Sequence, residues 1–165
     1  MTYAPDHALI ATPIGMVRIE GDHDRMSRIR IEGPIGDAQR SSNMRAVREA
    51  VSQLRAYFTG DRRAFDLPLI ALQSPRGEAL RTAIASVGYG ETLSYGALAR
   101  IIASGPRAVG QACARNPYPI VVPCHRILAS AGRLGAYSAG EGPATKQWLL
   151  DHETRHAEKD SKWAA

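Results

Sequence analysis

The sequence contains only two cysteines, Cys113 and Cys124, among 165 residues. Two thiols cannot form the disulfide framework of a small secreted protein, so the composition favours a reducing compartment. No apolar run approaches the ~20 residues needed to span a bilayer. The first residues also lack the basic and apolar regions of a secretory signal peptide. We therefore expect a cytoplasmic protein that does not associate with membranes.

Lysine is scarce beside arginine, and the formal net charge is +5. A basic balance favours polyanionic partners, and guanidinium groups suit phosphate contacts of fixed geometry, although a basic surface alone is also compatible with no such partner. Neither an internal repeat nor a low-complexity segment is present. A chain of this length suits one large domain or two small ones.

Alternating apolar residues at 14–19 and 26–31, on either side of turn residues 21–24, predict two antiparallel strands in the first part of the chain. Arg28 and Arg30 would share the solvent face of the second strand. Residues 41–43 offer an N-cap for a helix that ends near Gly60, and a short strand is expected at 65–69. Five apolar residues form the predicted stripe of this helix: Met44, Val47, Val51, Leu54 and Phe58. The pattern indicates a small sheet covered by one helix.

From residue 73 onward the pattern becomes helical. Pro75 suits the first position of a helix that ends before Gly88. A second helix is expected from Ser94 to 102 and a third from Pro106 to 114, and two short helices joined by a glycine-containing turn are typical of the helix-turn-helix. Arg107 would lie in the first turn of the third helix, where free N–H groups favour phosphates; a solvated surface arginine is the alternative. A final amphipathic helix is predicted before a frayed tail.

The tetrapeptide Pro123-Cys124-His125-Arg126 follows the apolar run 120–122, which reads as a short buried strand. A cysteine attacks as its thiolate, and a histidine base and a nearby positive charge raise the ionised fraction. Because successive side chains of an extended segment point to opposite faces, a turn or a bridging water would have to connect the thiol to the imidazole. The alternative is a buried structural cysteine before a surface His-Arg pair. Cys113 is expected to pack within its helix.

His152, Glu153 and His156 match H-E-x-x-H, the pattern of zinc proteases. Such a site needs a third protein ligand, and only Glu158 and Asp160 follow. Arg155 would also place a positive charge close to a dication. We therefore reject the zinc hypothesis and expect neither a metal nor a cofactor.

Taken together, these stretches resemble the O6-alkylguanine-DNA alkyltransferases, also called methylated-DNA–protein-cysteine methyltransferases. The matching segments are Gly90-Glu91-Thr92, Ser94-Tyr95-Gly96, Arg107-Ala108-Val109-Gly110, Asn116-Pro117, Pro123-Cys124-His125-Arg126, Gly135-Ala136-Tyr137-Ser138, Lys146, Trp148-Leu149-Leu150 and His152-Glu153. Upstream, residues 53–60 and 65–69 also resemble the family. The resemblance covers nearly the whole chain, and its Pro-Cys-His-Arg core is highly specific.

The resemblance implies an α+β fold with a ribonuclease H-like α/β domain over residues 1–72. A winged helix-turn-helix domain would follow over residues 73–157, with a frayed tail at 158–165. It also implies a monomer that acts on double-stranded DNA containing O6-alkylguanine, with O4-alkylthymine as a further candidate. The reaction would be one irreversible transfer of a methyl or small alkyl group, without turnover and after base flipping.

The resemblance assigns Cys124 as the alkyl acceptor and His125 as the base that takes its proton through a water. Glu153 would hold the tautomer of His125, Tyr95 would donate a proton or hydrogen bond to the departing guanine, and Asn116 would brace the active-site turns. The implied DNA-binding residues are Arg107, which would fill the gap in the base stack, Ser94, Tyr95, Ala108 and Arg126. The implied pocket residues are Tyr137, Ser138, Ile127 and Pro119.

The sequence departs from the family in three places. The usual Phe-Gln and Val-Trp pairs are missing from the stretch 75–80, the segment between Tyr95 and Arg107 is about two residues short, and the loop between Tyr137 and Lys146 is about two residues long. Two other functions stay open at this point. One is a lesion-binding protein without transfer, and the other is a DNA-binding regulator that uses only the helix pair.

Overall fold

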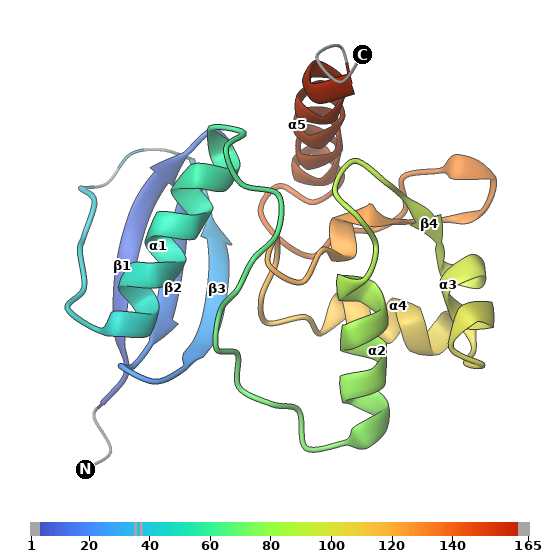
Figure 1. Cartoon of the computed structure of the whole chain (residues 1–165), viewed down its shortest axis with the longest axis horizontal. Coiled ribbons are helices and arrows are strands. Elements are labelled where there is room, and N and C mark those ends of the chain that lie inside the picture. The colour runs from blue at the N-terminus through green and yellow to red at the C-terminus, as the bar shows by residue number, and fades with distance from the viewer. Residues whose placement is uncertain (1–3, 35, 37, 162–165) are drawn as a thin grey trace. The chain divides into compact units, whose positions relative to one another are not determined.

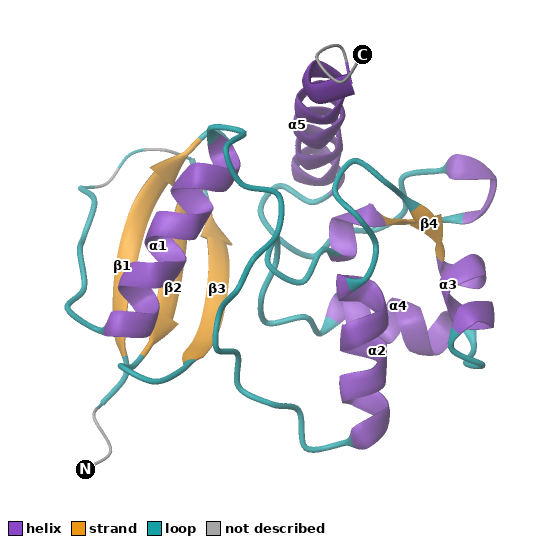
Figure 2. Ribbon diagram, viewed as in Figure 1, coloured by secondary structure: helices purple, strands orange, loops and turns teal. Residues whose placement is uncertain are grey.

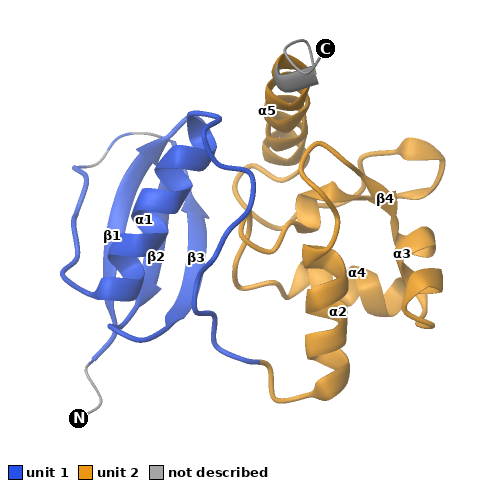
Figure 3. Ribbon diagram, viewed as in Figure 1, with its two compact units in different colours: residues 1–71 blue, residues 72–165 orange. Residues whose placement is uncertain are grey.

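The computed structural model describes residues 4–34, 36 and 38–161, and for residues 160 and 161 only the backbone. The chain divides into two compact units, residues 1–71 and residues 72–165 (Figure 3). This division lies one residue before the boundary expected from the sequence. In the described residues no helix is long and apolar enough to cross a membrane.

Unit 1 is an antiparallel sheet with one helix packed on it (Figure 1). Its strands are β1 (Asp6–Thr12), β2 (Gly15–Gly21) and β3 (Met26–Glu32), in that order, and the helix is α1 (Arg45–Phe58). The β1–β2 hairpin requires Gly15, whose φ is +110° and whose missing Cβ would lie 2.3 Å from the Gly33 oxygen. The core between sheet and helix contains Ala8, Ile10, Val17, Ile19, Met26, Ile29, Ala46, Val47, Ala50, Leu54 and Tyr57.

The predicted sheet covered by one helix is confirmed, and Arg28 and Arg30 do share the exposed face of β3. Strand β1 was not predicted, because its small and apolar residues do not alternate regularly. The strand expected at 65–69 is wrong; only Leu69 forms an isolated bridge, with Met26. The buried face of α1 is also rotated from the predicted stripe, since Ala50 and Tyr57 are buried in place of Val51 and Phe58, which are only half-buried.

Unit 2 contains four helices: α2 (Pro75–Ala85), α3 (Tyr95–Ile101), α4 (Pro106–Ala114) and α5 (Pro143–Ser161) (Figure 2). The predicted helix starts at Pro75 and Pro106 are confirmed. Ser74 caps α2 by accepting a hydrogen bond from the Gly77 N–H at 3.1 Å. Helices α3 and α4 pack against each other.

Two short parallel strands, β4 (Leu93–Ser94) and β5 (Ile127–Leu128), connect distant parts of unit 2. They place the start of α3 beside the segment that follows Cys124. Two 3₁₀ turns, η1 (Cys124–Arg126) and η2 (Ser130–Gly132), lie on either side of β5. Helix α5 continues to Ser161, whereas the sequence predicted a frayed tail from residue 158. Ala157, Glu158 and Lys159 are good helix formers, which explains the longer helix. Residues 162–165 of that expected tail lie outside the described residues.

Candidate active site

The segment before Cys124 is a series of turns, so the strand predicted at 120–122 is wrong. The Asn116 side chain organises these turns: its Oδ1 accepts from the Tyr118 N–H at 2.9 Å, and its Nδ2 donates to the Val122 oxygen at 2.8 Å. Ile120, which is 1% exposed, has a φ of +76°. A β-branched residue in this region is strained, and such strain persists only where the surroundings impose it. The apolar run is therefore a buried, strained turn.

Cys124 opens the 3₁₀ turn η1 directly after Pro123. Pro123 has φ −82° and ψ 61°, and the Cys124 N–H donates to the Val122 oxygen at 2.8 Å, which together define an inverse γ-turn. Asn116 Nδ2 also lies 3.2 Å from Cys124 Sγ and donates to it. The thiol is thus held by the same amide that shapes the preceding turns.

Cys124 is 5% exposed and lines a small cavity of about 150 Å³, which we call the Cys124 cavity. The cavity is bounded by Tyr95, Gly110, Cys113, Ala114, Cys124, Ala136, Tyr137 and Ser138. Of the residues predicted for the pocket, Tyr137 and Ser138 are in this lining. Pro119 and Ile127 are not: Pro119 is buried in the turn before Cys124, and Ile127 is buried in β5.

His125 is buried in the protein interior, with no exposed surface. Its Nε2 is 3.1 and 3.0 Å from the two carboxylate oxygens of Glu153 on α5. Its Nδ1 is buried and has no hydrogen-bond partner among the described residues. Burial lowers the pKa of His125, although the hydrogen bond and charge of Glu153 oppose this shift. The imidazole is therefore neutral at neutral pH, with Nδ1 as its available acceptor.

Arg126 was predicted to contact DNA, and this prediction is wrong. Its guanidinium is buried: Nε and a terminal nitrogen donate to Glu153 Oε1 at 2.8 and 2.5 Å, and the other terminal nitrogen donates to the Val87 oxygen at 2.6 Å. Burial alone would raise the pKa of Glu153, but the hydrogen bonds and charges of His125 and Arg126 hold it below its usual value. The Glu153 carboxylate thus binds the side chains of both residues that follow Cys124 in the sequence.

Lys146 on α5 supplies the positive charge that acts on Cys124, a role that sequence reasoning missed. Its Nζ is buried and donates to the Ile127 oxygen at 2.7 Å and the Ala136 oxygen at 3.3 Å. Burial raises the pKa of Cys124, while the Asn116 hydrogen bond and the Lys146 charge oppose that rise. The two carbonyl oxygens that hold the Lys146 ammonium lie 19 and 10 residues away in the sequence. The spacing of residues along the sequence therefore gave no signal that this lysine is buried.

Two tyrosines face the thiol across the Cys124 cavity. Burial raises the pKa of Tyr95, and it raises the pKa of Tyr137 well above the usual value, so both hydroxyls are protonated donors at neutral pH. The ring of Tyr95 lies 5.8 Å below the ammonium of Lys146. Cys113 also lines the cavity, and burial raises its pKa to about 12. Cys113 is therefore a protonated, unreactive neighbour.

The remaining predicted DNA-binding residues lie around α3 and α4. The Ser94 hydroxyl caps α3 by accepting from the Ala97 N–H at 3.0 Å. Arg107 is exposed in the first turn of α4. It shares one face of that helix with Gly110 and Ala114 of the Cys124 cavity, since these positions follow the i, i+3, i+7 spacing. Ala108 lies on another face and does not line the cavity.

The H-E-x-x-H residues of α5 do not form a metal centre. Glu153 is engaged by His125 and Arg126, and His156 Nδ1 lies 2.7 Å from the His152 oxygen. Within the described ranges, no group of three or more His, Cys, Asp or Glu side chains could hold a metal ion.

The chain is similar to known proteins over most of its length. Residues 77–155 match a family model described as the DNA-binding domain of 6-O-methylguanine DNA methyltransferase. A methylated-DNA–protein-cysteine methyltransferase of Mycolicibacterium paratuberculosis is 36% identical over 157 residues, covering 92% of this chain and 94% of the relative. A DNA base-flipping protein of Thermus thermophilus is 46% identical over 109 residues, covering 65% of this chain and 71% of that protein. A crystal structure of Mycobacterium tuberculosis OGT in complex with DNA matches with a TM-score of 0.77 at 33% identity, covering 90% of this chain and 92% of that chain.

A buried cysteine with a histidine–glutamate pair behind it, on a mixed fold of helices and small sheets, defines a thiol-dependent transferase. The chain belongs to the methylated-DNA–protein-cysteine methyltransferases and is an enzyme of that class. The resemblance found in the sequence is thereby confirmed.

Proposed function

We propose that this protein repairs DNA directly by moving a methyl or small alkyl group from O6 of guanine to Sγ of Cys124. The observation that carries the proposal is the position of this sulfur. It lies on the Cys124 cavity, it accepts from Asn116 Nδ2 at 3.2 Å, and its sequence neighbour His125 is paired with Glu153. An acceptor thiol, a neutral base and an orienting carboxylate are thus present together.

The proposed transfer is one in-line displacement. The proton of Cys124 passes to Nδ1 of His125 through a bridging water, and Glu153 stabilises the imidazolium that forms. The sulfur then bonds to the alkyl carbon, and the bond from that carbon to O6 breaks. The Tyr95 hydroxyl, whose raised pKa keeps it protonated, donates a hydrogen bond to the guanine anion as it departs, and the anion then takes up a proton from solvent. The thioether is stable and no second nucleophile lines the cavity in a reactive state, so we propose that each molecule reacts once.

We propose double-stranded DNA as the partner, with the alkylated base rotated out of the helix. The target atom lies on the base edge inside the duplex, and rotating the nucleotide out costs a few kcal/mol. The exposed Arg107 lies on the face of α4 that carries Gly110 and Ala114 of the Cys124 cavity. This position supports a role for Arg107 in filling the gap that the base leaves.

The finer architecture is also a proposal. Helices α3 and α4 pack together across the turn 102–105, which supports a helix-turn-helix, and the β4–β5 pair with the loop that follows would be its wing. The three antiparallel strands and single helix of unit 1 are compatible with a ribonuclease H-like domain. We propose that the protein acts as a monomer.

The test uses a duplex oligonucleotide with one O6-methylguanine and the intact mass of the protein. We expect the wild-type mass to rise by one CH₂ unit, since a methyl replaces the thiol proton, and to rise only once in excess substrate. Cys124→Ser should not change in mass, whereas Cys113→Ser should gain the methyl as the wild type does. An unchanged wild-type mass would refute the transfer reaction.

A second candidate is a protein that binds the lesion without accepting the alkyl group. Burial raises the pKa of Cys124, and a relative that is 46% identical is named a DNA base-flipping protein, so both observations favour this alternative. It predicts preferential binding to the methylated duplex, equal for wild type and Cys124→Ser, with no change in mass.

A further inference from the structure

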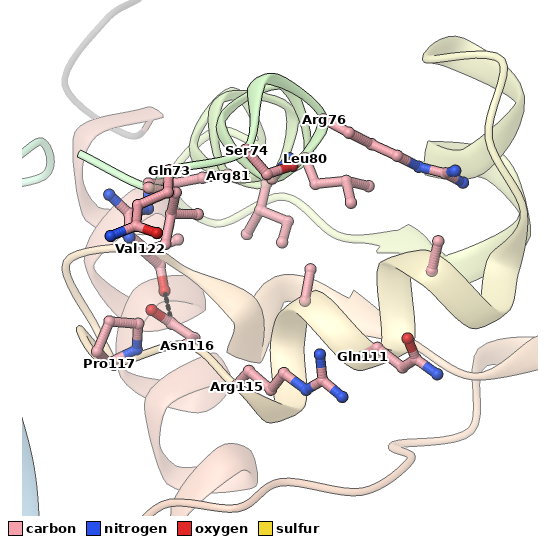
Figure 4. A pocket seen from close by; sticks show the side chains of 15 residues that line it. Gln73, Ser74, Arg76, Leu80, Arg81, Gln111, Arg115, Asn116, Pro117 and Val122 are labelled. Carbon is pink, nitrogen blue, oxygen red and sulfur yellow. Dashed lines mark hydrogen bonds between the residues drawn. The ribbon is translucent and has the colours of Figure 1, made fainter.

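Helix α4 separates two cavities. Its residues Gly110, Cys113 and Ala114 line the Cys124 cavity. The opposite side of the helix faces a larger space of about 600 Å³ between α2 and α4, which we call the α2/α4 groove (Figure 4). It is lined at helical spacing by three residues of α4 and by the C-cap residue of that helix: Ala108, Gln111, Ala112 and Arg115. The proposed reaction uses only the first of these two cavities.

The groove owes its size to small side chains. Ala108 and Ala112 face it from α4, and Gly77 lies on the side of α2. Gly77 belongs to the stretch in which this chain lacks the family's usual Phe-Gln and Val-Trp pairs. Larger apolar side chains, Leu80 and Ile84 of α2 and Val122 of the turn before Cys124, complete the walls. A volume of about 600 Å³ lies within the range of small-molecule sites.

Three arginines and no carboxylate line the groove. Arg81 is already engaged, because its guanidinium lies 5.3 Å above the Tyr118 ring and 3.4 Å from Glu78. The other two are available. Arg76 donates only to the Ser104 hydroxyl at 3.4 Å, and Arg115 has no side-chain partner in the part of the chain that the structure describes. Arg76 comes from α2 and Arg115 is the C-cap residue of α4. Figure 4 shows their guanidinium groups apart from each other, so the groove carries positive charge at two separate places.

One end of the groove is formed by the active-site turns. Figure 4 shows Asn116 and Pro117 at this end, with the hydrogen bond from Asn116 to Val122 drawn, while Arg76 lies toward the other end. A molecule bound here would therefore lie against the side chain that also donates to Cys124 Sγ.

We propose that the α2/α4 groove binds a small organic anion with a flat apolar body, such as an aromatic carboxylate. The apolar walls would cover the ring, and the charged group would bind the guanidinium of Arg76 or that of Arg115, according to the direction in which the molecule lies. A phosphodiester chain fits less well, because it has no apolar part to cover Leu80, Ile84 and Val122. Charge-assisted hydrogen bonds to guanidinium are among the strong ones, so the charge should decide affinity.

The test is isothermal titration calorimetry of the full chain with 2-naphthoate, and with uncharged 2-naphthalenemethanol as its matched probe. We expect saturable binding of one 2-naphthoate, and binding of the alcohol weaker by about tenfold or more. Arg76→Gln with Arg115→Gln should weaken 2-naphthoate binding to a similar degree. Arg100→Gln, which removes an exposed arginine of α3 outside the groove, should bind as the wild type does.

Ala112→Phe fills the groove and should abolish binding, with circular dichroism as the check that the variant folds. If this variant does not fold, the proposal is tested by the arginine variants of the preceding experiment alone. Absence of saturable binding, equal affinity for the two probes, or an equal loss in Arg100→Gln would overturn the proposal. It would also be overturned if 2-naphthoate fails to bind while the Arg76/Arg115 variant loses affinity for an undamaged duplex, since the groove would then be a DNA-contacting surface.

Discussion

Replacing Glu153 by glutamine tests the buried charge cluster at the active site most directly. Glu153 is 1% exposed and accepts hydrogen bonds from the guanidinium of Arg126 and from Nε2 of His125. Glutamine has nearly the same shape but no charge, and its NH₂ group would face donors. Arg126 would be left as a buried cation whose other acceptor is the Val87 oxygen. Removing one partner of a buried ion pair typically costs about 3–5 kcal/mol, and we expect a loss of this size.

The measurement is the free energy of unfolding in urea, followed by tryptophan fluorescence, because Trp148 lies on the same helix as Glu153. Asp151→Asn is the matched control, since Asp151 is an exposed acid of α5 whose carboxylate accepts from Gln147, and it should change stability by less than about 0.5 kcal/mol.

A double variant separates charge from shape. Glu153→Leu with Arg126→Met removes both charges, and replacing a buried ion pair by apolar groups is often neutral or stabilising. The double variant should therefore regain most of the lost stability. The rate at which Cys124 accepts an alkyl group should stay low, because His125 has lost the carboxylate that orients it. A loss below about 1 kcal/mol in Glu153→Gln, or a double variant no more stable than the single one, would refute the reasoning.

Three further predictions concern charge and backbone. Lys146→Met removes the charge that opposes the raised pKa of Cys124, so the pH at which iodoacetamide modifies Cys124 should shift upward, as peptide mass mapping against pH would show. Burial lowers the pKa of His125 below its ordinary value of 6.5, so the unfolded chain binds the proton more readily than the folded one. The free energy of unfolding, measured in urea at a series of pH values, should therefore fall as the pH drops below about 6.5. His125→Gln should remove this part of the decline. Gly15→Ala should lower the free energy of unfolding of unit 1 in urea by about 1–3 kcal/mol, because Gly15 has a φ of +110° and an added Cβ would lie 2.3 Å from the Gly33 oxygen. The reactivity of Cys124 should not change.

Local sequence signals predicted many elements of the fold. Pro75 and Pro106 mark helix starts because a ring-locked φ and a missing N–H are tolerated only in the first turn. Alternation located β2 and β3, since one face of each strand must be buried. The strand expected at 120–122 failed for a non-local reason: the side chain of Asn116 binds the Tyr118 N–H and the Val122 oxygen, and so bends an apolar run into turns.

The sequence predicted Cys124 as the nucleophile, but it did not indicate which charged side chains interact with the thiol and its sequence neighbours. The resemblance implied that Arg126 contacts DNA, yet its guanidinium is buried and paired with the Glu153 carboxylate of α5. The cation that acts on Cys124 is Lys146, also on α5. Such pairings depend on where the last helix packs, and hydrophobic periodicity does not report which charged side chains a helix buries.

Because His125 and Arg126 both bind Glu153, the active site can be complete only after α5 has packed. The carboxylate that neutralises Arg126 and binds His125 is supplied by α5, far along the chain from these two residues. A chain in which α5 has not yet packed would have a guanidinium with no counter-ion and an imidazole with no fixed orientation. The base that we propose for Cys124 would therefore become oriented only once α5 has packed against the 3₁₀ turn η1.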